Sequence, residues 1–107
     1  MTHKLNKIII CSDGFEISVQ ANENAYCTPR INNADRYTEV ECGFPSCSEP
    51  LLIEYAEEPN SPTETVYAWV PSMVITNVIA KHGGIVSGEV PPGVAFLKAP
   101  KNVNMQV

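Results

Sequence analysis

The segment from Pro71 to His82 constrains the fold most, because its apolar residues recur at helical spacing. The residues that fall on one side of such a helix are Val74, Ile75, Val78 and Ile79. Burying that side would contribute on the order of 1.5 to 3 kcal/mol per side chain before conformational entropy is counted. Pro71 suits the first helical residue, and Gly83 suits the left-handed residue beyond the last turn. The sequence therefore predicts one α-helix over about residues 71–82.

The N-terminal part of the chain has the pattern of a β-hairpin. Two β-rich runs, Ile8 to Cys11 and Phe15 to Val19, flank an Asp-Gly pair at Asp13, which predicts a hairpin with a primed turn. The second run alternates apolar and polar residues, as expected for a strand with one face in the core. The first run is apolar on both faces, which indicates a strand that is covered on both sides or that docks a partner.

Further strands are predicted from short β-rich runs that are bounded by turn residues. These runs are Tyr37 to Cys42, Leu51 to Tyr55 and Val66 to Val70, with additional short strands at Ile85 to Ser87 and Val94 to Lys98. The 107 residues, of which 44% are hydrophobic, suffice for one core and are too few for two ordinary domains. We therefore expect a single α+β domain over residues 1–107, in which a mostly antiparallel sheet of about five strands packs with the one helix.

Negative charge is concentrated in the middle of the chain. The segment from Tyr37 to Ala80 contains no lysine or arginine and has seven glutamates, which are Glu39, Glu41, Glu49, Glu54, Glu57, Glu58 and Glu64. The formal net charge of -5 arises from this segment, because the rest of the chain has a small positive excess. Such a balance argues against direct binding to nucleic acid or to an anionic membrane, since both rely on Lys and Arg contacts to phosphates. A partner protein with a basic surface fits better, although a solvated acidic surface is the simpler interpretation.

No combination of residues in the sequence predicts catalysis or a cofactor. The carboxylates lack the spacing of a general acid and base pair, and Gly83 and its neighbour follow a helix instead of preceding one as phosphate-binding glycines do. A histidine at the end of a helix, such as His82, is typical of a residue that caps carbonyl groups. We therefore expect that the protein is not an enzyme and has no resident metal. A zinc site would use Cys27, Cys42, Cys47 and His82 as ligands, but the spacing of these residues does not favour such a site.

An asparagine-rich connection from Ala21 to Arg36 offers an alternative site for a small ligand. Structureless loops of this length are uncommon in compact domains and are often functional. The residues that would converge on such a ligand are Tyr26, Cys27, Arg30 and His82. In that alternative, Arg30 would bind an anionic group.

The N-terminus shows no secretion signal, because the apolar run after Lys7 is shorter than the core of a signal peptide. No stretch approaches the roughly 18 apolar residues of a membrane span. We therefore expect a location in the cytoplasm, where the cysteines stay reduced.

Several short motifs resemble those of small accessory proteins of bacteriophages. They are Ser18 to Ala21, Tyr26 with Pro29 and Arg30, Val40 and Glu41 with Gly43 to Ser46, Val66 and Tyr67 with Val70 and Pro71, and His82 to Gly84. The resemblance covers about residues 15 to 85 and implies no catalytic or binding residue. It implies a setting, since phage proteins made inside a host often bind a host protein and block it.

These observations favour a small acidic interaction protein that binds and blocks a host protein with a basic surface. A nucleic-acid-binding defence complex would present such a surface. The expected contact residues are Glu39, Glu41, Glu54, Glu57, Glu58 and Trp69. The alternatives are a homodimeric structural or accessory protein, paired through exposed strand edges or through Ile8 to Cys11, and a small-ligand or zinc-binding domain.

Overall fold

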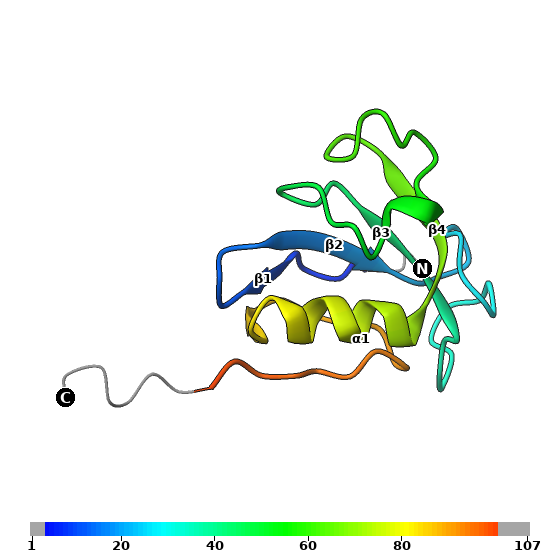
Figure 1. Cartoon of the computed structure of the whole chain (residues 1–107). Helices are drawn as coiled ribbons and strands as arrows, with labels where there is room; N and C mark the ends of the chain where they lie inside the picture. Colours follow the sequence, from blue (N-terminus) through cyan, green and yellow to red (C-terminus); the bar gives the residue numbers. More distant parts are fainter. Residues whose placement is uncertain (1–3, 101–107) are drawn as a thin grey trace, which may run out of the picture.

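The computed structural model describes residues 4–100. Its elements in chain order are β1 (Ile9–Cys11), β2 (Glu16–Gln20), β3 (Glu39–Gly43), the 3-10 helix η1 (Ile53–Tyr55), β4 (Val66–Pro71), α1 (Ser72–Lys81) and β5 (Ile85–Ser87). The five strands form one sheet in the order β4-β3-β2-β1-β5, and every neighbouring pair is antiparallel. Helix α1 lies along one face of this sheet (Figure 1). The predicted α+β arrangement is confirmed.

The core lies between α1 and the sheet face that α1 covers. Alternate residues of neighbouring strands meet there as buried cross-strand pairs, namely Ile9 with Ile17, Val19 with Cys42 and Val40 with Val70. From the helix, Ile75, Val78 and Ile79 are fully buried, and Val74 is partly buried against the same cluster. Both predicted periodicities, two in the strands and 3.6 in the helix, therefore lead to the same core.

The ends of α1 differ slightly from the prediction. Pro71 is the last residue of β4 and the N-cap, so the helix begins at Ser72, whose N–H donates to the carbonyl of Thr38. At the other end, Gly83 has the predicted left-handed conformation, with φ of 90°. The N–H of Gly84 donates to the carbonyl of Ile79, which completes the double hydrogen bond typical of a glycine-terminated helix.

The hairpin between β1 and β2 is present, but the predicted turn type is wrong. A primed turn is a two-residue loop with positive φ at its first residue, whereas in this turn positive φ occurs only at Gly14, the last residue before the second strand run. The loop has three residues, Ser12, Asp13 and Gly14, because the Cys11 N–H pairs with the Phe15 carbonyl at 2.8 Å. The Asp13 carboxylate accepts the Phe15 N–H at 2.9 Å, which stabilises this wider turn.

Two of the predicted strands are wrong. Leu51 to Tyr55 forms turns and η1 instead of a strand. The Glu49 carboxylate accepts the Leu51 N–H at 2.8 Å, and the backbone carbonyl of Glu49 accepts the Leu52 N–H. These bonds start a turn where the apolar run alone suggests a strand. The run from Val94 to Lys98 makes a single bridge, between Ile85 and Lys98, and forms no strand.

Strand β1 has a hydrogen-bonded neighbour on each side, so Ile9–Cys11 has no free edge for pairing with another chain, while Ile8 lies before the strand and is exposed. The sheet edges are β4 and β5, and other segments cover part of each. On β5, Ile85 bonds to Leu97 and Ala99, and on β4 the Val66 carbonyl accepts the N–H of Glu57. Within residues 4–100, no helix is both long enough and apolar enough to cross a bilayer.

Candidate functional site

Glutamates gather on the side of the sheet that α1 leaves uncovered. Glu39 and Glu41 alternate along β3 with the buried residues Val40 and Cys42, and they therefore project away from the core. Partial burial, followed by the negative charges of Glu54 and Glu39, raises the pKa of the Tyr55 phenol. Glu54 and Glu39 therefore both lie near the Tyr55 hydroxyl. We define the acidic face as Glu39, Glu41, Glu54, Glu57 and Glu58.

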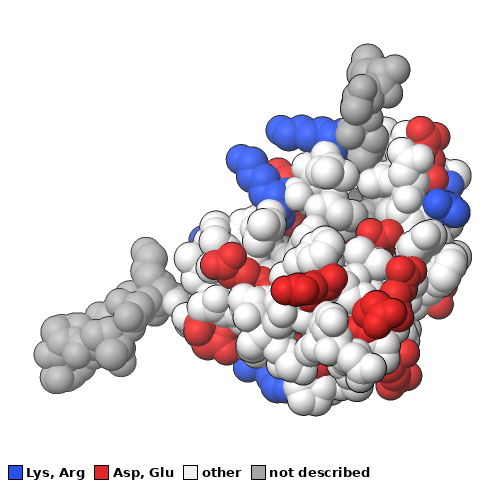
Figure 2. Space-filling model, turned by 90° about the horizontal axis from the view of Figure 1, so that it is seen from above, with Lys and Arg blue, Asp and Glu red and all other residues white. Residues whose placement is uncertain are grey.

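The last two residues of the acidic face follow η1 and are tied to the edge strand β4. The Glu57 N–H donates to the Val66 carbonyl at 3.0 Å, and the Glu58 N–H donates to the Thr65 hydroxyl at 3.0 Å. Figure 2 views the molecule from this side and shows Asp and Glu side chains over its middle, with Lys and Arg toward its margins. Tyr37, which precedes β3, is buried and does not belong to this surface, and its hydroxyl donates to the Ile31 carbonyl.

The carboxylates of the acidic face have no ion-pair partner among residues 4–100. Every ion pair in that part of the chain belongs to a separate cluster, formed by Asp13, Glu49, Lys81 and His82. Two of the carboxylates are nevertheless held in place by one oxygen each. Oε1 of Glu41 accepts the Tyr26 N–H at 2.9 Å, and Oε1 of Glu39 accepts the Thr28 hydroxyl at 2.7 Å. Their charge is therefore fixed in position and uncompensated.

An aromatic pair, Tyr26 and Trp69, lies beside Glu41. The two ring centroids are 5.1 Å apart, and the Trp69 N–H donates to the Tyr26 carbonyl at 3.0 Å. Trp69 sits in a β-bulge, where Ala68 and Trp69 together face Glu41. Its φ is 47°, which is rare for a bulky residue, and its side chain remains 47% exposed. The sequence predicted Trp69 as a partner contact, but it did not predict that Trp69 packs against Tyr26.

The four residues of the alternative ligand site do not converge. Tyr26 and Arg30 are neighbours, since the guanidinium carbon lies 5.5 Å from the ring centroid. Cys27 is buried and its thiol donates to the Asn22 carbonyl, while burial raises its pKa above the ordinary value. His82 lies at the C-terminal end of α1, in contact with Phe15 and Asp13. In residues 4–100, no three His, Cys, Asp or Glu side chains are grouped so as to hold a metal ion.

His82 forms the centre of a charged cluster that the sequence did not predict. Its Nδ1 lies 2.6 Å from Oδ2 of Asp13, and its Nε2 lies 2.7 Å from Oε1 of Glu49. Its ring stacks on Phe15 at a centroid distance of 4.0 Å, and Lys81 bonds the second oxygen of Glu49 at 2.9 Å. We call Asp13, Glu49, Lys81 and His82 the His82 network. The side chain of His82 therefore binds carboxylates instead of capping the helix carbonyls.

This geometry favours a charged imidazole, because only the charged ring has a proton on each nitrogen and can donate to both carboxylates. Burial opposes the charged form, but the hydrogen bonds to Asp13 and Glu49 outweigh it and raise the pKa of His82. In the same way, burial opposes ionisation of Glu49, and the bonds from Leu51, Lys81 and His82 nevertheless lower its pKa. Neither nitrogen of His82 keeps a free lone pair, so this ring is not arranged as a general base.

The stability contributed by His82 is expected to decline as the pH rises. Its pKa is raised in the folded protein, and in the unfolded chain it is about 6.5. The contribution is therefore complete below about pH 6.5 and is lost as the pH rises through the folded pKa. The variant His82→Gln should lack this decline. Urea unfolding of both proteins between about pH 5 and pH 9 would measure it, and the same alkaline slope in both would contradict the assignment.

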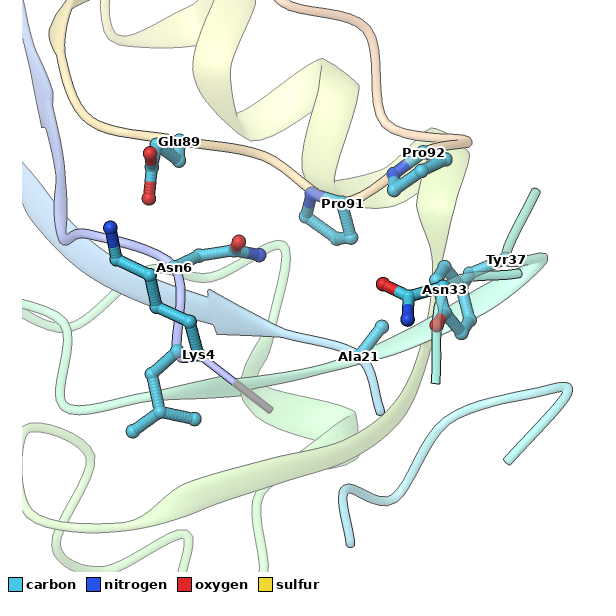
Figure 3. A pocket seen from close by; sticks show the side chains of 9 residues that line it. Lys4, Asn6, Ala21, Asn33, Tyr37, Glu89, Pro91 and Pro92 are labelled. Atoms are coloured by element: carbon cyan, nitrogen blue, oxygen red, sulfur yellow. The ribbon is translucent and has the colours of Figure 1, made fainter. Parts of the chain in front are cut away.

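A pocket of about 410 Å³ lies on another part of the molecule, between the N-terminal segment and residues 89–92. Figure 3 shows Lys4 and Glu89 at one end, and Pro91, Pro92 and Tyr37 around the other. One oxygen of Glu89 accepts the Lys7 N–H at 2.8 Å. The lining combines one charge of each sign with apolar rings, and it favours no one class of ligand.

Comparison of the chain with protein-family models, with curated proteins and with solved structures gave no match. The functional interpretation therefore depends on the geometry of the acidic face, the aromatic pair and the His82 network.

Proposed function

We propose that this protein is a small interaction protein whose acidic face binds a basic surface on a partner protein and blocks it. The observation that carries the proposal is that its five carboxylates have no ion-pair partner among residues 4–100. Like charges held close together repel one another, and a cationic partner relieves that repulsion. Two of the carboxylates are already positioned by Tyr26 and Thr28, which reduces the ordering cost of binding.

The chemistry of the acidic face suits a partner that binds nucleic acid. Such proteins present Lys and Arg side chains to phosphate groups, and an acidic surface can occupy the same groups. The resemblance to phage accessory proteins adds that the partner is a protein of the host cell. Blocking then needs no catalysis, because the bound protein covers the surface that the nucleic acid would use.

The double variant Glu39→Gln/Glu41→Gln is expected to weaken binding to a basic probe, such as an oligolysine peptide, about tenfold. Glutamine keeps an acceptor oxygen for the hydrogen bonds from Thr28 and Tyr26, so the loop should stay in place. Isothermal titration calorimetry would measure the affinity. The affinity of the parent should also fall as ionic strength rises from about 0.01 M to about 0.1 M, because the Debye length shortens from about 30 Å to about 10 Å.

A matched control removes two negative charges from another part of the surface. Asp35→Asn/Glu89→Gln lies outside the acidic face, since Asp35 adjoins Gly93 to Ala95 and Glu89 contacts Lys7. This control should bind the oligolysine peptide nearly as well as the parent. If both double variants lose affinity equally, net charge alone governs binding, and the acidic face is not the site. The same pair of variants can identify the partner in a pull-down from host lysate, as the protein that only Glu39→Gln/Glu41→Gln fails to retain.

A further inference from the structure

A positively charged group already lies against the aromatic pair. The Arg30 guanidinium carbon is 5.5 Å from the Tyr26 ring centroid, within the range of a cation–π interaction. This side chain is held loosely, because it is exposed and its side-chain hydrogen bond, to the Asn24 carbonyl, is 3.5 Å long. Tyr26 therefore accepts a guanidinium in the free protein without a strong additional tether.

Trp69 presents a second ring beside that of Tyr26, and the backbone of Trp69 is constrained. The backbone N–H of Trp69 donates to the Tyr26 carbonyl, and the residue has a positive φ in the β-bulge. Such a conformation costs about 1 to 3 kcal/mol and persists only where surrounding structure enforces it. Tryptophan attracts cations most strongly among the aromatic residues, and it is enriched among the residues that dominate binding energy. The backbone of Trp69 is thus held in position, and its ring is exposed beside that of Tyr26.

Glu41 supplies an acceptor beside the two rings. Its Oε1 receives the Tyr26 N–H at 2.9 Å, while Oε2 receives no hydrogen bond from residues 4–100. A planar guanidinium can stack on an aromatic ring and at the same time donate N–H groups to a carboxylate. A lysine ammonium is compact and strongly hydrated, so it gains less from the same combination.

We infer that Tyr26, Trp69 and Glu41 form an arginine-binding site, in which the partner's arginine stacks on Trp69 and donates to Oε2 of Glu41. This inference rests on the proposed function and names the side chain that the acidic face recognises. Arg30 occupies part of the site in the free protein and opposes a second cation, so Arg30→Gln should raise the affinity for an arginine peptide about twofold to threefold.

The test compares three peptides of equal length that contain arginine, lysine or the neutral analogue citrulline. Trp69 is the only tryptophan of the chain, so its fluorescence reports occupation of this site directly. We expect the arginine peptide to bind about fivefold more tightly than the lysine peptide and to change the fluorescence, because stacking is added to charge attraction. The citrulline peptide should not bind measurably.

Variants at Trp69 separate this inference from the proposed function. Asparagine tolerates positive φ and lacks the aromatic ring, so Trp69→Asn should bind arginine and lysine peptides equally, with salt-dependent affinity retained. Trp69→Phe should keep part of the arginine preference. Calorimetry applies to all variants, and a cooperative thermal unfolding transition would show that each is folded.

The possible outcomes are distinct. If the parent binds both charged peptides equally, or if Trp69→Asn keeps the full arginine preference, the arginine site is wrong while the acidic face remains supported. If Glu39→Gln/Glu41→Gln binds both peptides as tightly as the parent does, the proposed function fails and the arginine site fails with it. Both proposals are supported if Glu39→Gln/Glu41→Gln weakens binding of both charged peptides, and if the arginine preference is lost in Trp69→Asn and partly kept in Trp69→Phe.

Discussion

Replacing Glu49 with alanine is expected to lower the free energy of unfolding by about 3 kcal/mol, because it leaves buried hydrogen-bonding groups and a charge without their partner. The Glu49 side chain is only 1% exposed and links the loop before η1 to the end of α1. One oxygen bonds His82 at 2.7 Å, and the other bonds both Lys81 and the Leu51 N–H. Its removal therefore disconnects the loop before η1 from the end of α1.

The matched control for this substitution is Glu58→Ala. Glu58 is exposed and has no ion-pair partner among residues 4–100, so its replacement should change the free energy of unfolding by no more than about 0.5 kcal/mol. Urea unfolding at about pH 6, below the raised pKa of His82, would measure both variants. Equal effects of the two substitutions would show that the His82 network adds nothing to stability.

The elements that the sequence predicted well are those with local determinants. The helical spacing of apolar residues and the glycine at 83 act within one or two turns, and α1 follows the prediction within one residue at each end. The hairpin is likewise specified by adjacent residues. Leu51 to Tyr55 was predicted wrongly because its apolar pattern is suited to a strand, while the deciding hydrogen bond comes from the side chain of Glu49.

The candidate site was predictable only in part. Charge alone indicates that most of the glutamates lie at the surface, but Glu49, from the same acidic segment, is buried. Its partners Lys81 and His82 are 32 and 33 positions away, and no local pattern connects them. The same limit applies to Tyr26 and Trp69, which meet because a loop and a bulge approach each other across the outer side of β3. Such contacts between distant segments depend on the whole fold.

Replacing Gly93 with alanine is the second substitution with a large expected effect. The residue has φ of 107°, and a methyl group there would lie 2.2 Å from the Tyr37 carbonyl oxygen and 3.0 Å from the Tyr37 nitrogen. The control is Gly14→Ala, where φ is 94° and the new methyl would meet nothing within 4 Å. Both substitutions carry the left-handed strain of about 1 to 2 kcal/mol. Only the first adds a clash with backbone, which costs a further 1 to 3 kcal/mol, approximately.

The backbone around Tyr37 has little freedom to avoid that clash. Its N–H donates to the Pro92 carbonyl at 2.9 Å, and its carbonyl accepts the hydroxyl of Ser72, the first residue of α1, at 2.7 Å. Val94, the next residue after Gly93, is buried in the core cluster, which also limits movement of this segment. Urea unfolding should therefore show a larger loss for Gly93→Ala than for Gly14→Ala. Equal losses would mean that residues 91–95 can shift without disturbing the start of β3, the strand that carries Glu39 and Glu41.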